Sequence, residues 1–209
     1  MMVTMSSVLA ATSVLAATKV WWFVSRASGI VAWALLALAV LWGLALSTRA
    51  LGRRPAAPWL LDVHRFMGGL AVLFTIVHFS VLALDPWFTS EYGYRITQAL
   101  VPFAIGWKSG AVAWGVVAFW LLLAVELTSL VRTRIPQDLW RWVHLTSYAL
   151  YAMATVHLLT AGSERENPVL RWSVLATVGA VVFFTMYRIV GPGRAESVKQ
   201  SRPRRETGA

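Results

Sequence analysis

The sequence predicts an all-α fold, a polytopic helical bundle that spans a membrane. Of its 209 residues, 58% are hydrophobic and only 13% are charged. Five apolar segments are each long enough to cross a hydrocarbon core of about 30 Å as a helix, and none alternates like the strands of an outer-membrane barrel. We therefore expect five core transmembrane helices, and we place them at 28–48, 61–84, 109–131, 142–161 and 169–190.

Each expected span is nearly free of charge. Residues 29–47 carry none, 66–84 carry none apart from one histidine, and 143–161 carry only two histidines. Residues 111–130 contain one carboxylate, Glu126, and 169–190 contain Arg171 and Arg188 close to the two ends. Charges confined to helix ends are typical of membrane spans, because a charged group at the bilayer centre is costly.

The segments outside the spans have different characters. Residues 1–19 form an N-terminal apolar segment, which we expect to be an interfacial or a sixth helix, although its Ala-rich stretch also resembles a cleavable signal without the positive n-region. The connection 85–108 is the longest, and we expect a partly ordered cap with one short helix at 94–101. Residues 191–209 are expected to be a disordered basic tail. The core domain then covers 20–190.

Positive charge is concentrated on one side of the expected bundle. The net charge is +10, and most of it lies after the first, third and fifth spans, at Arg49, Arg53, Arg54, Arg132, Arg134, Arg141, Arg188, Arg194, Lys199, Arg202, Arg204 and Arg205. The positive-inside rule places these segments, and the C-terminus, in the cytoplasm of a multi-pass protein of the cell membrane. For such a protein, contact with membrane lipid is favoured over binding of nucleic acid.

All four histidines lie on two of the expected spans, in two nearly matched pairs. His64 and His78 are 14 residues apart, and His144 and His157 are 13 apart. Each pair therefore spans roughly 20 Å along a helix, which is most of the way across the hydrocarbon core. A single histidine in a membrane helix often has a hydrogen-bonding role, but four at two matching depths favour metal ligation. The pattern predicts two stacked b-type haems with two imidazoles each.

Topology supplies the pairing of the histidines. The second and fourth spans run in the same direction, so His64 and His144 should ligate the inner haem iron, and His78 and His157 the outer one. The chain has no cysteine, which excludes thiolate ligation. At about 100° per residue, 14 residues leave an offset of about 40° whereas 13 leave about 140°. Either the fourth span is locally distorted or its two haems approach from different sides.

The histidine spacing and several short motifs resemble the ferric reductase-like transmembrane domain, the membrane part shared by NADPH oxidases and ferric reductases. The motifs are SRASG at 25–29, HR at 64–65, LDPW at 84–87, LVPF at 100–103 and WRWVH at 140–144, and the likeness covers roughly 20–190. The resemblance implies two b haems that pass electrons from a cytoplasmic flavin outward. It also implies an oxidoreductase role, as the electron-transfer subunit of a transmembrane reductase.

The donor should be a separate molecule. Family members that oxidise NADPH continue into a nucleotide-binding domain, whereas this sequence ends 19 residues after its last expected span. It is similar instead to stand-alone bacterial members, including the haem-binding subunit of the methionine sulfoxide reductase system. We therefore expect electrons from a separate reductase or from quinol, with any quinone or flavin supplied by a partner, and an electron acceptor at the outer face.

Cationic residues near the two faces are candidates for binding haem propionates. Arg65 and Arg141 adjoin the inner ligands, while Arg26 and Lys108 lie at the outer ends of the first and third spans. Ordinary snorkelling is the alternative for each, and Lys108 could instead attract an anionic acceptor. The carboxylate of Glu126 should pair with an arginine, stay protonated, or serve a quinone or proton route.

Two other functions compete with the dihaem conduit. The first is a quinol-dependent reductase that acts directly on extracytoplasmic Fe(III) or flavin. The second is a divalent-metal transporter, which usually shows broken helices and carboxylates near the midplane. Since the histidines lie towards the two faces, the sequence favours the conduit over the transporter.

Overall fold

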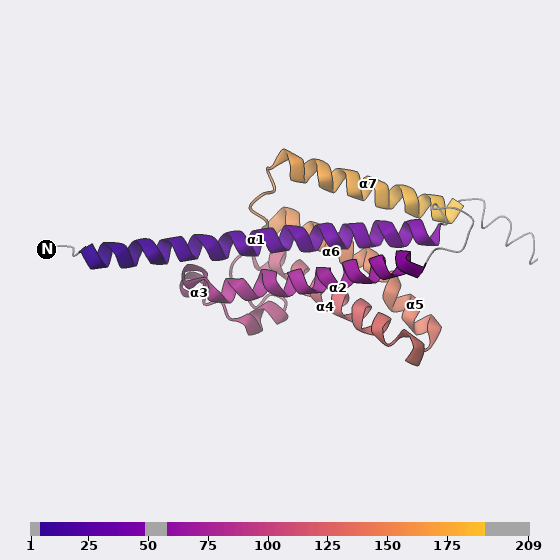
Figure 1. Cartoon of the computed structure of the whole chain (residues 1–209), viewed down its shortest axis with the longest axis horizontal. Coiled ribbons are helices and arrows are strands. Elements are labelled where there is room, and N and C mark those ends of the chain that lie inside the picture. Colours follow the sequence, from indigo (N-terminus) through magenta and orange to yellow (C-terminus); the bar gives the residue numbers. More distant parts are fainter. Residues whose placement is uncertain (1–4, 49–57, 191–209) are drawn as a thin grey trace, which may run out of the picture.

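The computed structural model describes residues 5–48 and 58–190, with side chains from residue 19 onward (Figure 1). Every regular element in this part of the chain is helical. The elements, in order, are α1 (Met5–Ser47), α2 (Pro58–Ser80), η1 (Val81–Leu84), α3 (Pro86–Tyr92), η2 (Ile96–Leu100), α4 (Ser109–Leu130), η3 (Arg132–Arg134), α5 (Gln137–Leu145), α6 (Ser147–Ala161) and α7 (Pro168–Val190). The expected all-α membrane bundle is confirmed.

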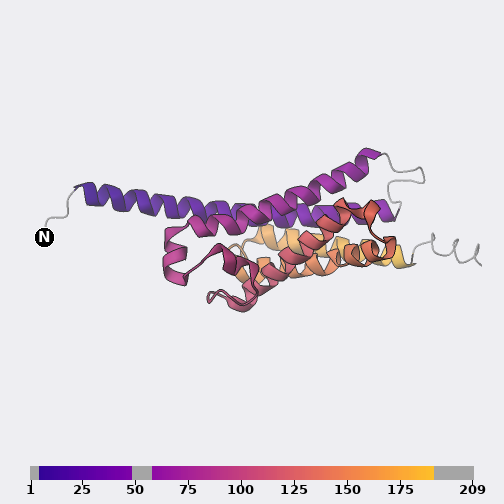
Figure 2. The ribbon, with the colours of Figure 1, turned by 90° about the horizontal axis from the view of Figure 1, so that it is seen from below.

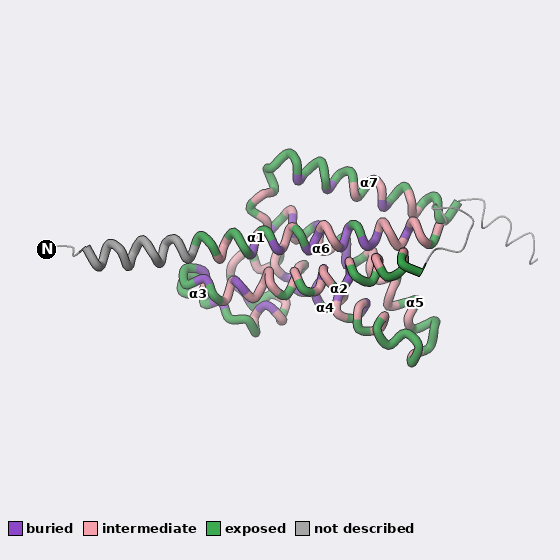
Figure 3. The backbone as a smooth tube through the Cα atoms, viewed as in Figure 1, coloured by how far each residue is buried: buried purple, intermediate pink, exposed green. Residues whose placement is uncertain are grey.

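Four helical stretches are long and apolar enough to cross a membrane. They are Lys19–Ser47 of α1, Pro58–Leu84 of α2 and η1, α4 and α7. They correspond to the first, second, third and fifth expected spans. Many of their large apolar side chains are exposed, which suits helices that face lipid rather than water. Figure 3 shows this exposure along the outward faces of α2 and α7.

The fourth expected span is not one continuous helix. It is divided at Thr146 into α5 and α6, and α6 has only 15 residues. The Thr146 N–H and hydroxyl both donate to the carbonyl of Val143, at 3.0 and 2.6 Å. A threonine that bonds back to its own helix competes with the regular backbone pattern and bends it. The fourth expected span is therefore present as two successive helices, and its crossing of the membrane stays a prediction.

The described part of the N-terminal segment continues α1. The helix is unbroken from Met5 to Ser47, so its 43 residues extend roughly 65 Å, about twice the hydrocarbon thickness. These residues therefore do not form a separate sixth helix. The expected disordered tail at 191–209 and the basic residues at 49–57 lie outside the described residues.

Helix α1 lies at the centre of the packing. It packs against α2, α6 and α7, while α4 packs mainly against α6 (Figures 1 and 2). The buried cluster between these helices contains Trp33, Leu36 and Val40 of α1 together with Leu122 of α4 and Leu150 of α6. Two hydroxyl contacts add polar links, Trp33 Nε1 to Thr155 at 3.0 Å and Tyr151 to Thr177 at 2.8 Å.

The connection between α2 and α4 forms an ordered cap over the end of the bundle that the charge distribution predicts to face outward, and this end is called outer below. Asp85 is fully buried and accepts from the backbone N–H groups of Trp87 and Phe88, with Pro86 in the first turn, and these features start α3. Gly93 ends α3 with φ 59°. The short helix expected at 94–101 is present as the 3₁₀ helix η2, whereas α3 was not expected. The cap packs Phe88, Tyr94 and neighbouring aromatic rings over the outer end of the bundle.

Candidate functional site

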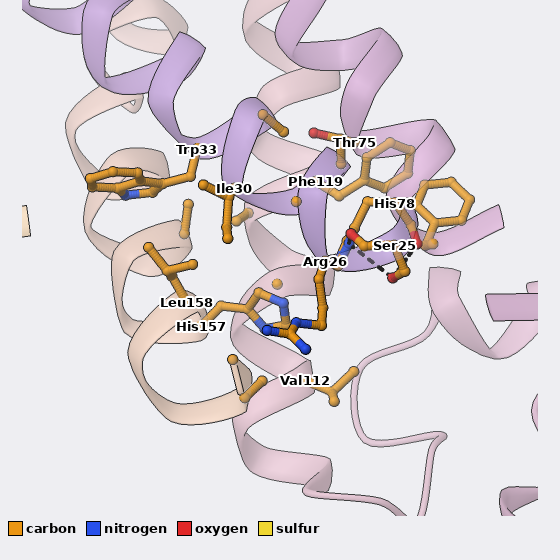
Figure 4. A pocket seen from close by; sticks show the side chains of 18 of the residues that line it. Ser25, Arg26, Ile30, Trp33, Thr75, His78, Val112, Phe119, His157 and Leu158 are labelled. Atoms are coloured by element: carbon orange, nitrogen blue, oxygen red, sulfur yellow. Dashed lines mark hydrogen bonds between the residues drawn. The ribbon is translucent and has the colours of Figure 1, made fainter. Parts of the chain in front are cut away.

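The outer histidine pair joins α2 to α6. The ring centroids of His78 and His157 are 6.2 Å apart, with an angle of 78° between the ring planes. Both side chains lie beside the cavity shown in Figure 4, at the end of the bundle that the cap covers.

The inner histidine pair joins α2 to α5. The ring centroids of His64 and His144 are 6.1 Å apart, with an angle of 67° between the ring planes. On a regular helix the 13-residue spacing would turn His144 and His157 towards different sides. The break at Thr146 separates their helices, so both rings meet α2 histidines that share one face. Of the two alternatives left open by the spacing, the structure has the local distortion.

The distance within each pair matches what two axial imidazoles require. An imidazole nitrogen lies roughly 2 Å from a bound metal and roughly 1 Å from its own ring centroid, so two imidazoles on opposite sides of one metal have centroids about 6 Å apart. Both observed separations agree with this value. The donor set is suitable too, because paired imidazoles are a common axial set for haem iron.

Backbone carbonyls orient the two outer imidazoles. His78 Nδ1 lies 2.7 Å from the carbonyl oxygen of Ser25, and His157 Nδ1 lies 2.9 Å from that of Ala111. A carbonyl only accepts, so each Nδ1 carries the proton and each Nε2 keeps its lone pair for a metal. The Ser25 hydroxyl also donates to the carbonyl of His78 at 2.9 Å, which ties α1 to this turn of α2 (Figure 4).

The inner imidazoles have different surroundings. Within the described residues, Nδ1 of His144 is buried and has no hydrogen-bond partner, whereas His64 faces the carbonyl of Ala39 without a hydrogen bond of ordinary geometry at Nδ1. The ring of Trp140, one turn earlier on α5, stacks on His144 with centroids 5.0 Å apart, and the Arg132 guanidinium lies 4.7 Å from the centre of the Trp140 ring. Stacking, rather than a hydrogen bond, fixes the orientation of this ring.

Glycines make room for three of the four imidazoles. A Cβ atom at Gly29 would lie 2.7 Å from His78 Nδ1, one at Gly115 would lie 2.7 Å from His157 Nδ1, and one at Gly43 would lie 3.2 Å from His64 Cε1. The two outer rings therefore occupy space that a Cβ would fill, whereas a Cβ at Gly43 would only crowd the ring of His64. Sequence reasoning missed these residues, although Gly29 and Gly43 are 14 apart, like His64 and His78, on two helices that form a hairpin.

A cavity of about 210 Å³ adjoins the outer pair. Apolar and aromatic side chains from α1, α2, α4 and α6 make most of its lining, including Trp33, Phe79, Phe119, Leu122 and Leu158. Arg26 and Glu164 lie in the lining together with both histidines (Figure 4). Such a lining excludes water from the two rings and suits a flat apolar group held by two nitrogen ligands.

Comparison with protein-family models matches residues 28–155 to the family described as ferric reductase like transmembrane component. The chain belongs to this family. Comparisons with curated proteins and with solved structures give no match. The matched region includes three of the four histidines and ends at Thr155, two residues before His157.

The two cationic residues expected to bind propionates of the outer haem have different partners in this ferric reductase-like chain. Arg26 forms an ion pair with Glu164 beside the outer cavity. The Lys108 ammonium approaches the carbonyls of Thr160 and Ala161 at 3.5 and 3.4 Å, and it thereby caps the C-terminus of α6.

The two arginines expected near the inner pair are exposed. Arg65 pairs with Asp62 at 3.5 Å and Arg141 pairs with Asp138 at 3.4 Å, each within its own helix. Their role towards a propionate, like those of Arg26 and Lys108, stays a prediction.

Glu126 lies on α4 over Gly68 of α2, in space that a Cβ at position 68 would fill. Among the described residues it forms no ion pair, so the expected arginine partner is not found there.

The described residues also contain no group of three or more histidine, aspartate or glutamate side chains that could hold a metal ion. Each layer offers two imidazoles, the ligand number that iron in a porphyrin needs.

Proposed function

We propose that this ferric reductase-like chain is a membrane-embedded dihaem cytochrome b, which carries electrons from a cytoplasmic flavoprotein or quinol donor to an acceptor at the outer face. One observation carries the proposal: two imidazole pairs stand at two depths of the bundle, each at the separation of axial ligands to one metal. His64 and His144 would hold the inner haem, and His78 and His157 the outer haem.

Iron with two axial imidazoles has no open coordination position, so such a haem supplies single-electron exchange rather than oxygen binding. The chain's own residues would prepare this exchange. The Ser25 and Ala111 carbonyls hold the outer rings in the tautomer that presents Nε2. The glycines let the rings approach neighbouring helices, and the aromatic cap keeps water from the outer layer.

The charges at one end of the bundle support the proposed orientation. Arg132 and Arg134 of η3 are exposed next to α5, which carries His144, and Arg188 lies in the last turn of α7. By the positive-inside rule this end faces the cytoplasm of a cell-membrane protein. A basic surface beside the inner layer also suits an acidic donor protein, whose attraction weakens as salt screens the charges.

The purified, haem-loaded protein tests the proposal directly. We expect a reduced-minus-oxidised spectrum of low-spin haem b and a pyridine haemochrome value of two haems per chain. A value of one haem per chain at demonstrated saturation would remove the two-layer assignment. A protein that takes up no haem would remove the cytochrome function altogether.

A further inference from the structure

A groove separates α1 from α7 on the side of the bundle away from α2. It has a volume of about 700 Å³ and is lined mainly by apolar residues of both helices, among them Phe23, Ala27, Ala34, Leu38 and Val169. Both helices are long and apolar enough to span the membrane. The groove would therefore be reached from the lipid phase, and its lining matches a molecule with an apolar part.

The groove has a polar end at the outer face. The ion pair between Arg26 and Glu164 lies there, and Asn167 at the start of α7 lies beside it. In the described part of the chain, the buried Nε of Arg26 has no hydrogen-bond partner. This end offers donors and an acceptor but little net charge. It suits a neutral head with carbonyl or hydroxyl oxygens better than the phosphate of a lipid, which Glu164 would repel.

The polar end also reaches the outer histidine layer. Five residues line both the groove and the cavity beside His78 and His157, and they are Arg26, Ile30, Trp33, Glu164 and Leu170. Arg26 and His157 line the same cavity, and Figure 4 shows Arg26, Ile30 and Trp33 along one helix beside it. A head group at Arg26 and Glu164 would thus be separated from the outer layer by a single layer of side chains.

We infer that the α1–α7 groove binds a membrane quinone, and that this quinone is an electron acceptor at the outer layer. The inference rests on the proposed function with a cytoplasmic flavoprotein as donor, since that donor would bring electrons to the outer layer from outside the quinone pool. Reduction of one quinone takes two electrons, delivered singly, and two protons from the outer aqueous phase. An O–H bond forms at each carbonyl oxygen while the donor is oxidised. Arg26 would donate to one carbonyl, and the Glu164 carboxylate would take up a proton from the outer aqueous phase and pass it to the head.

Filling the groove tests the inference. Ala34 and Ala27 line the groove but not the cavity, so Ala34→Phe and Ala27→Phe should block a quinone without touching the histidine layer. Ala176→Phe on the exposed face of α7 is the matched control. The haem-loaded full chain would be reduced with dithionite in detergent and freed of reductant. It would then be mixed anaerobically with decylubiquinone or with ferricyanide, and haem reoxidation would be followed by absorbance.

We expect reoxidation by decylubiquinone to slow at least ten-fold in both groove variants and to stay unchanged in Ala176→Phe, with reoxidation by ferricyanide equal in all four proteins. A photoreactive azidoquinone should label 23–38 and 164–177, and excess decylubiquinone should suppress the label. Equal decylubiquinone rates in all proteins, or a label displaced by phospholipid but not by decylubiquinone, would overturn the inference. Absence of bound haem would instead refute the proposed function, so the two failures are distinguishable.

Discussion

At the scale of residues, the two imidazole pairs depend on groups that carry no side-chain chemistry. Carbonyls of Ser25 and Ala111 hold the outer rings, and glycines on α1 and α4 give the rings room. The histidines themselves could be paired from sequence, because spacing and helix direction fix their depths. The carbonyls that bind the outer rings could not be predicted from sequence. Their positions depend on the register between α1 and α2 and between α4 and α6, which side-chain identity alone does not set.

The pairing makes the four histidines functionally unequal. His64→Ala and His144→Ala should lose the same inner haem, while His78→Ala and His157→Ala should lose the outer one, because each iron needs both of its imidazoles. Redox titration of the four variants would resolve two components in the wild type and one in each variant. If the His64 and His157 variants lost the same component, the layer assignment would be incorrect.

Substitution of Gly29 should affect the outer haem as strongly as substitution of one of its histidine ligands. In Gly29→Ala the new methyl group would lie 2.7 Å from His78 Nδ1, so the ring must move and its bond to Ser25 must lengthen. Overpacking of this kind costs about 1–3 kcal/mol, more than the 0.5–1 kcal/mol or so that alanine gains over glycine in a helix. We expect a lower thermal midpoint and loss or a shifted potential of the outer haem.

The control for that variant is Gly69→Ala on α2, where nothing lies within 4 Å of the added methyl group. It should keep both haems and be equally or more stable, by helix propensity alone. A Gly29→Ala protein with wild-type stability and unchanged redox titration would show that the outer ring does not rest on this glycine.

At the scale of elements, the helices differ from those expected in a segment that has no proline or glycine to indicate a helix end. The break at Thr146 lies in an apolar run without proline or glycine. The 13-residue histidine spacing left a local distortion open, but no residue type in the run indicated its position. It follows from a side chain that bonds to Val143 and from packing of α5 and α6 against other helices. The start of α3 had a sequence signal in Asp85 followed by Pro86, an N-cap residue and a proline in the first turn, although the helix of this connection was expected at 94–101.

The outer cap should loosen at high pH through Tyr94. Its hydroxyl donates to the carbonyl of Phe79 at 2.8 Å, and burial raises the pKa of Tyr94 from 10.0 to about 12. The unfolded phenol loses its proton at lower pH than the folded one, so this contribution to stability is complete below pH 10 and is lost as the pH rises towards about 12. Thermal unfolding between pH 9 and roughly 12 would measure it. Tyr94→Phe should flatten this part of the profile, and an equally steep fall in that variant would assign the loss to another group.

At the scale of the whole molecule, the two ends of the helical bundle differ in charge and in covering. Exposed arginines surround the inner end, an aromatic cap closes the outer end, and the two histidine layers lie between them. The gathering of arginines at one end of the bundle could be predicted from the sequence, because charge and hydropathy vary along the chain. Which end faces the cytoplasm stays a prediction. The sequence could not predict the groove between α1 and α7, since that space depends on how two apolar helices diverge in three dimensions.

Electron transfer across a sealed membrane should therefore require both layers in order. In proteoliposomes of known orientation, a reductant confined to the cytoplasmic side should reduce an impermeant acceptor on the outer side. His78→Ala and His157→Ala should stop this transfer while leaving reduction of the inner haem intact, because the inner pair faces the donor and shares no ligand with the outer pair. His64→Ala should instead block reduction of both the outer haem and the acceptor from that side. Unchanged transfer in His78→Ala and His157→Ala would mean that electrons bypass the outer layer, and the conduit mechanism would have to be abandoned.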